Sequence, residues 1–178
     1  GMVGAKRILE IGTFVGISAI FHANALKRNG VHGGVDETGH KPIVCLELEN
    51  RFAEVAHRNF VDAGVEDYIE VIVGDANQSL AQLQGVSFDI AFIDADKESY
   101  VGYYETIIAK GLLNKSGIFI IDNTAFESVV AYIDAPVPVS PDYKPLRLPY
   151  ETNDTRNETA SVLHEFNEHI RNDPRVEV

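Results

Sequence analysis

The sequence predicts an α/β fold that is Rossmann-like in architecture, with a mainly parallel sheet covered by helices on both faces. Apolar, strand-like runs alternate with amphipathic, helix-like segments along the chain. The strand-like runs are continuously apolar, as is typical of parallel strands that are buried on both sides. A glycine-rich turn follows the first of them. The length of 178 residues suits one domain, taken here as 1–178.

Composition excludes several classes of partner. The formal net charge is -12 and the isoelectric point is about 4.8, so the surface repels nucleic-acid phosphates. No apolar run approaches the ~18 to 20 residues that a membrane-spanning helix needs. A single cysteine, Cys45, rules out an internal disulfide, is expected in the core, and fits a reducing compartment. We therefore expect a cytoplasmic protein with no nucleic-acid or membrane partner.

Each predicted element follows from a local pattern of residues. In the helix at 51–63, for example, Phe52, Val55 and Phe60 recur at helical spacing. Apolar runs predict strands at 7–11, 43–48, 68–73, 88–94 and 117–122, with the start of a sixth at 176–178. Amphipathic spacing predicts helices at 16–28, 51–63, 77–84, 98–110 and 157–171.

Two segments depart from this alternation. Residues 29–42 form a long polar loop that contains two histidines. Residues 135–149 are too rich in proline for a helix. The second segment is interpreted either as a lid or substrate loop or as a plain surface connection.

Ligands of open parallel sheets bind at the carboxyl ends of the strands, so the strand ends are considered together. The first strand runs into Gly12 and Gly16, in a G-x-x-x-G turn. Such a turn can admit an anionic ligand close to the backbone, although a purely structural turn is nearly as plausible. The spacing differs from the G-x-G-x-x-G dinucleotide fingerprint, which disfavours a nucleotide-binding oxidoreductase.

Acidic residues end the second and third strands. Glu47 and Glu49 share one face of the strand, and either could accept hydrogen bonds from ribose hydroxyls or simply be solvated. Asp75 could accept from an adenine amino group or could cap the following helix. The residue types leave all of these alternatives open.

The fourth and fifth strands end in Asp94 and in Asp122-Asn123. Neighbouring parallel strands would bring these oxygen donors together, and such a set suits Mg²⁺. Without a cation, two nearby carboxylates would repel one another. Lys97 lies one turn beyond Asp94, where it can act as a base or orient an oxygen. Asp96 is expected to cap the next helix.

Taken together, the motifs resemble those of the metal-dependent S-adenosylmethionine O-methyltransferases, which include the caffeoyl-CoA and catechol O-methyltransferases. The resemblance covers residues 5–178, and its specific part is FIDADKESY (92–100) with IDN (121–123). The other matching motifs are ILEIGTFVGISA (8–19), CLELENRFAEVAHRNF (45–60) and VIVGDA (71–76).

The resemblance implies roles for individual residues, each transferred by motif position. Ser18 would bond the carboxylate of the methionine part of the cofactor, and Glu47 would hold the ribose. Lys97 would be the general base. The cofactor-binding set would be Gly12, Phe14, Ser18, Glu47, Asp75, Ala76 and Asp94, and the metal ligands would be Asp94, Asp122 and Asn123.

The implied activity is methyl transfer from S-adenosylmethionine to one hydroxyl of a small catecholic or phenolic acceptor, assisted by a divalent cation, Mg²⁺ by expectation. A homodimer is a further expectation. The alternative is a catalytically idle, cofactor-binding domain that acts through protein contacts. Compared with the family pattern, we expect the N-terminal helices and final strand to be lacking. Loop 29–42 is longer than expected, and no glycine occurs in 124–128 after IDN.

Overall fold

The structure is a computed structural model that describes residues 4–83, 85–125 and 153–178. Its residues form two compact units, 1–122 and 123–178, which are described separately. The predicted proline-rich loop 135–149 lies outside the described residues. The expectation of a single domain stays a prediction.

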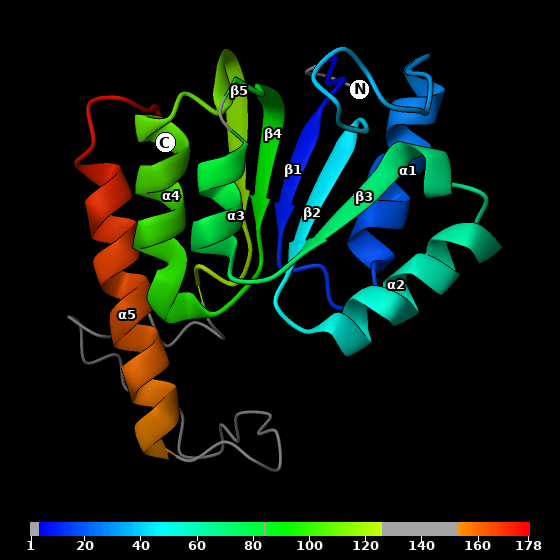
Figure 1. The fold of residues 1–178 in the computed structure, drawn as a ribbon. Coiled ribbons are helices and arrows are strands. Elements are labelled where there is room, and N and C mark those ends of the chain that lie inside the picture. Colours follow the sequence, from blue (N-terminus) through cyan, green and yellow to red (C-terminus); the bar gives the residue numbers. More distant parts are fainter. Residues whose placement is uncertain (1–3, 84, 126–152) are drawn as a thin grey trace. The chain divides into compact units, whose positions relative to one another are not determined.

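The first unit contains a five-stranded parallel sheet with the strand order β3-β2-β1-β4-β5 (Figure 1). Its strands are β1 (Ile8–Ile11), β2 (Ile43–Glu47), β3 (Ile69–Val73), β4 (Phe88–Ile93) and β5 (Leu113–Ile121). Every pairing is parallel, so the carboxyl ends of all five strands meet at one edge. The predicted Rossmann-like α/β fold is confirmed.

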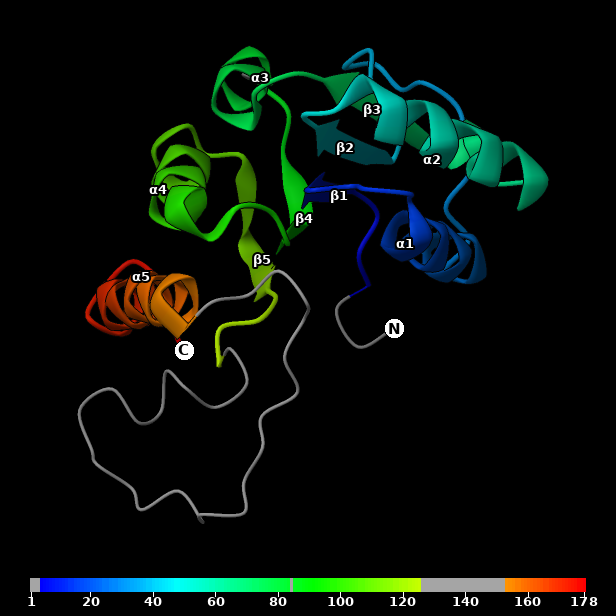
Figure 2. The same cartoon turned by 90° about the horizontal axis from the view of Figure 1, so that it is seen from below.

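Helices cover both faces of this sheet. Figures 1 and 2 show α1 (Ile17–Arg28) and α2 (Asn50–Asp62) on one side, with α3 (Ala76–Gln82) and α4 (Tyr100–Ala109) on the other. Two short 3₁₀ helices, η1 (Glu66–Tyr68) and η2 (Lys97–Ser99), precede β3 and α4. Among the helices described, none is both long enough and apolar enough to cross a membrane.

The core lies between the sheet and its helices, as the apolar strand pattern predicts. All residues of β1 and β2 are buried, and Cys45 belongs to this core. Phe60 of α2 packs in the same buried cluster as Ile8 and Ile43. On the opposite face, α4 buries Tyr100, Tyr103, Tyr104 and Ile107. Burial of this apolar surface is the main stabilising contribution to the fold.

Strand β5 is longer than predicted. It begins at Leu113 rather than at Gly117, and its pairing with β4 shifts register between Phe88 and Ile90. The added residues Asn114, Lys115 and Ser116 are exposed. Among the described strands β5 lies at an edge of the sheet, where polar residues are tolerated, so its first half lacks the apolar pattern of a buried strand.

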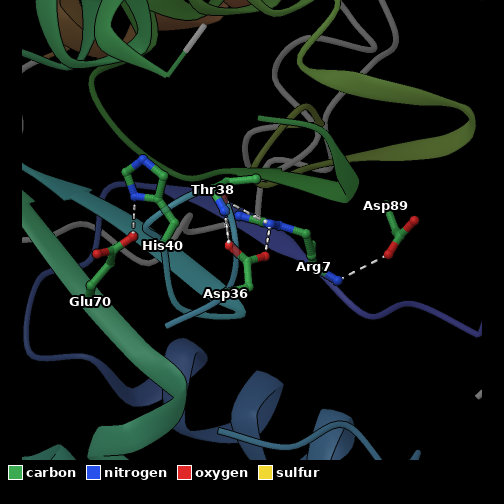
Figure 3. Close-up of polar contacts among 6 residues, drawn as sticks. All are labelled: Arg7, Asp36, Thr38, His40, Glu70 and Asp89. Carbon is green, nitrogen blue, oxygen red and sulfur yellow. Dashed lines mark hydrogen bonds and ion pairs between the residues drawn. The ribbon is translucent and has the colours of Figure 1, made fainter. Parts of the chain in front are cut away.

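The long polar loop 29–42 is anchored at the amino-terminal ends of the strands (Figure 3). The Arg7 guanidinium donates to the Asp36 carboxylate and to the Thr38 hydroxyl, the latter at 3.1 Å. His40 Nδ1 lies 2.6 Å from an oxygen of Glu70, at the start of β3. These contacts place the loop at the edge opposite to the strand ends where ligands are expected.

The second unit contains α5 (Asn153–Arg171). Ala160, Leu163 and Phe166 are fully buried and lie on one face of this helix. The side-chain amide of Asn167 donates to the Thr124 carbonyl at 2.9 Å. The expected start of a sixth strand is wrong, because residues 176–178 have no regular structure and Val178 is exposed.

Gly12 permits a close approach of two backbone segments. Its φ is +89°, and a Cβ atom built there would lie 1.9 Å from the carbonyl oxygen of Asp94. Gly111 also has a positive φ, of +63°, but a Cβ atom there would meet nothing within 4 Å. A substitution at Gly111 would therefore introduce backbone strain alone, whereas a substitution at Gly12 would add a steric clash.

We therefore expect G12A to lower the free energy of unfolding by about 3 kcal/mol or more, since a clash between backbone segments adds to strain. G111A should cost only about 1–2 kcal/mol, from its left-handed conformation. Urea unfolding followed by circular dichroism measures both. Equal losses would show that the Gly12 approach does not constrain the fold.

Candidate active site at the carboxyl edge of the sheet

The sheet register places Asp94 and Asp122 on neighbouring strands. Ile93 and Ile121 are paired at the ends of β4 and β5, and each aspartate is the next residue along. The Asp122 amide donates to the Ile93 carbonyl at 3.0 Å, while the Asp94 amide donates to the Ile11 carbonyl at 2.9 Å. The structure thus brings together these two predicted metal ligands, at the edge that also holds the glycine turn.

Of the two acids at the end of β2, Glu47 is buried and Glu49 is exposed. Glu47 is 7% exposed, whereas the side chain of Glu49 is 52% exposed. One oxygen of Glu47 accepts from the amides of Thr13 and Phe14 at 3.2 and 2.7 Å, and the other from the Glu49 amide at 2.9 Å. A carboxylate offers about four acceptor positions, so capacity for a further donor remains. The binding of ribose by Glu47 stays a prediction.

Phe14 adopts an uncommon backbone conformation in the glycine turn. Its φ is +50°, a region that side chains other than glycine seldom occupy. The side chain is 58% exposed, and its ring centroid lies 4.6 Å from that of Phe52. Strain of this kind persists only where the surroundings impose it, and the Glu47 carboxylate provides that constraint through the Phe14 amide.

Glu10 is a candidate functional residue that the strand pattern did not single out. It is fully buried in β1, and its two oxygens contact Ser18 Oγ at 2.9 Å and His22 Nδ1 at 3.0 Å. Since a carboxylate only accepts, the hydroxyl and this ring nitrogen both donate. The signal for it was an acid inside an otherwise apolar strand. The predicted role of Ser18 toward the cofactor is untested, and here its proton points to Glu10.

The third strand leads into a capped helix. The Asp75 side chain accepts from the Asn77 amide at 2.8 Å, at the N-terminus of α3 that begins with Ala76. The structure therefore bears out the capping interpretation of Asp75. Contact of Asp75 and Ala76 with an adenine remains a prediction.

Lys97 lies beside Asp94 as predicted. Its ammonium is 3.2 Å from Asp94 Oδ1 and 2.5 Å from the hydroxyl of Tyr100. Burial, followed by the negative charge of Asp94, raises the pKa of Tyr100 well above its usual value. The phenol therefore keeps its proton at physiological pH.

The expected capping role of Asp96 is wrong. Asp96 occupies the position before η2, but its side chain makes no capping hydrogen bond. Its Oδ1 instead accepts from the Tyr103 hydroxyl at 2.7 Å. This donor is available because Tyr103 lies on the inner face of α4. Burial and this bond together raise the pKa of Tyr103.

The residues at the ends of β4 and β5 fit a hard divalent cation. Carboxylate oxygens are ligands that Mg²⁺ favours, and a cation would relieve the repulsion between Asp94 and Asp122. Asn123 directly follows Asp122 with a φ of +60°, a conformation that asparagine tolerates, and it begins the second unit. Its membership of the ligand set stays a prediction.

The fold is that of the Rossmann-like methyltransferases. The chain superimposes on the S-adenosylhomocysteine-bound methyltransferase PaMTH1 of Podospora anserina with a TM-score of 0.75 and 30% identity, over 98% of this chain and 66% of that one. An O-methyltransferase from Bacillus cereus, solved in complex with S-adenosylhomocysteine, gives 0.71 and 31%, over 99% and 66% of the two chains.

The sequence comparisons identify the family. The family model described as O-methyltransferase matches residues 1–178, and the chain belongs to this family. It is 39% identical over 123 residues to the catechol O-methyltransferase of Mycobacterium tuberculosis, covering 69% of this chain and 50% of the relative. It is 32% identical over 182 residues to the caffeoyl-CoA O-methyltransferase of Populus kitakamiensis, covering 99% and 66%. The chain thus spans one half to just under two thirds of these relatives.

The hydrogen bonds of Glu47 lead to a stability prediction. E47Q should lower the free energy of unfolding by about 1–3 kcal/mol, because three backbone amides, one of them buried, lose a charged acceptor. The matched variant E49Q alters an exposed side chain and should change stability by about 0.5 kcal/mol or less. Chemical denaturation measures both. Similar small effects in the two variants would contradict the constraining role of Glu47.

Proposed function

We propose that the chain carries the cofactor and metal side of an S-adenosylmethionine-dependent O-methyltransferase that acts on small catecholic or phenolic acceptors. One observation carries the proposal. The Lys97–Asp94 pair lies next to Asp122, at the same sheet edge as the glycine turn that Glu47 holds in place. Membership of the O-methyltransferase family supports it.

The cofactor would lie along the ends of β1, β2 and β3. Gly12, Phe14 and Ser18 would line its methionine end, with the buried Glu10 carboxylate behind Ser18. Glu47 would accept from the ribose hydroxyls with the capacity left after its three amide bonds. Asp75 and Ala76 would adjoin the adenine at the start of α3. Two of the solved relatives hold S-adenosylhomocysteine, which supports the binding of a cofactor of this type.

The acceptor would lie at the ends of β4 and β5. A divalent cation held by Asp94, Asp122 and Asn123 would lower the pKa of an acceptor hydroxyl. Lys97, whose side-chain nitrogen is 3.2 Å from Asp94 Oδ1, would receive the proton of that hydroxyl in its neutral amine form, or would orient the hydroxyl oxygen in its ammonium form. The fixed strand ends would hold the acceptor oxygen in line with the methyl group, which is the arrangement that transfer requires.

Charge favours a free phenolic acceptor over a coenzyme A thioester. Acidic side chains dominate the described carboxyl edge, namely Glu47, Glu49, Asp75, Asp94, Asp96, Glu98 and Asp122, against Lys97 and Arg51. The whole chain has a net charge of -12. The phosphates of coenzyme A would be repelled by such a surface.

The proposed activity predicts metal-dependent methylation of a simple catechol such as 3,4-dihydroxybenzoate. The purified chain with S-adenosylmethionine and Mg²⁺ should form the monomethyl ether, and chelation by EDTA should abolish the product. D94N should reduce turnover by about 100-fold or more, since it removes a charged ligand. Mass spectrometry of the product measures each rate. Cofactor binding without any turnover would instead favour a catalytically idle domain.

The acceptor preference is tested separately with one aromatic group in two forms. Caffeic acid should be methylated with a kcat/KM about tenfold or more above that of caffeoyl-CoA at low salt, because steering of charged ligands depends on the local field. Raising the ionic strength should narrow the ratio, as added salt screens the repulsion. A preference for the thioester would contradict the electrostatic argument.

A further inference from the structure

Tyr100 connects three groups at the candidate site. It is the first residue of α4 and is fully buried. Its hydroxyl lies 2.5 Å from the Lys97 ammonium, 3.4 Å from the carbonyl of Ile93 and 3.3 Å from the carbonyl of Asp122. Those carbonyls belong to the ends of the two strands that carry the candidate metal ligands.

The hydrogen-bonding capacity of a phenol matches these neighbours. An ammonium only donates, so the Tyr100 oxygen accepts from Lys97. Its single proton is then directed toward the carbonyl of Ile93 or of Asp122. Ile93 also accepts the amide of Asp122, so the same carbonyl takes part in the β4–β5 ladder. The hydroxyl therefore joins the lysine to the backbone on which both aspartates are mounted.

Among the described residues, the side chains of Asp94 and Tyr100 restrain the position of the Lys97 ammonium. It belongs to the one-turn helix η2, and its side chain is 16% exposed. The ammonium contacts Asp94 Oδ1, the Tyr100 hydroxyl and the face of the Tyr100 ring, whose centroid is 4.7 Å away. A long, flexible side chain needs such contacts to stay in one geometry.

We infer that Tyr100 is a positioning residue, which holds the Lys97 ammonium beside Asp94 and fixes it to the ends of β4 and β5. This role rests on the proposed function, because it concerns the residue expected to handle the acceptor proton. The restraint that Tyr100 places on the Lys97 ammonium can also be measured without turnover. In this arrangement Tyr100 acts through Lys97 and touches neither the acceptor nor the cofactor.

The variant Y100F removes only the hydroxyl and keeps the ring that packs in the core. We expect kcat to fall about tenfold while the KM for S-adenosylmethionine stays within about twofold, since loss of orientation affects the chemical step. Y68F is the matched control. It also removes a tyrosine hydroxyl, which lies 3.1 Å from the Val31 carbonyl and outside the site, and it should leave kcat unchanged.

A double-mutant cycle distinguishes positioning from a general loss of structure. If Tyr100 acts through Lys97, Y100F should cause no further loss of kcat in a K97M background. A merely structural tyrosine would reduce kcat by the same factor in both backgrounds. Additive losses in the double variant would overturn the assignment.

A second measurement follows Lys97 without requiring catalysis. Brief acetylation with an N-hydroxysuccinimide ester, read by mass spectrometry, should label Lys97 about threefold faster in Y100F than in the wild type, because a restraining hydrogen bond is lost. Exposed Lys110 serves as the internal reference in each sample. An unchanged labelling ratio would overturn the assignment. Absence of metal-dependent turnover in the wild type would refute the proposed function, and the labelling would still decide the role of Tyr100.

Discussion

The close approach of Gly12 to Asp94 is the constraint on which the candidate site depends. No side chain fits between the turn after β1 and the end of β4, because the carbonyl of Asp94 occupies the space of a Cβ atom. The glycine turn and the first candidate metal ligand are therefore set against each other by backbone contact alone. The proposed cofactor side and the proposed acceptor side of the edge are thus held by one backbone contact, which suits a reaction between two bound molecules.

Buried acids at this edge are each matched by donors. Glu47 accepts three backbone amides, while Glu10 accepts a hydroxyl and an imidazole. A charge removed from water is tolerated only with such partners. Asp94, which the Lys97 ammonium contacts, and Asp122 are both more accessible than Glu10 and Glu47. The contacts of Glu10 and Glu47 thus fix two carboxylates inside the protein, while Asp94 and Asp122 lie where solvent can reach them.

Much of the fold and part of the site could be predicted from local patterns. Continuous apolar runs located β1, β2, β3 and β4 to within one residue at each end. Parallel packing was enough to bring Asp94 and Asp122 to one edge. The strand order was not accessible in this way, because the neighbour of β1 is set by contacts distant in sequence.

The features that escaped prediction depend on where side chains point. Glu10 lies within a predicted strand and Tyr100 within a predicted helix, and neither was given a role of its own, yet the polar atoms of both contact residues of the candidate site. Asp96 bonds Tyr103 instead of capping a helix. Helical spacing identifies which face of α4 is buried, but it does not show where a hydroxyl at the end of a buried ring will lie.

Loop 29–42 lies away from the proposed active site, so the loop can be modified without altering that site. Its anchors, through Arg7 and through the His40–Glu70 contact, all lie at the amino-terminal ends of the strands. Exposed loops distant from a site accept changes in length and sequence readily. A fluorescent reporter or an immobilisation tag introduced near Glu37 would thus leave the carboxyl edge untouched. A label at this loop would lie at the amino-terminal edge of the sheet, opposite the proposed active site.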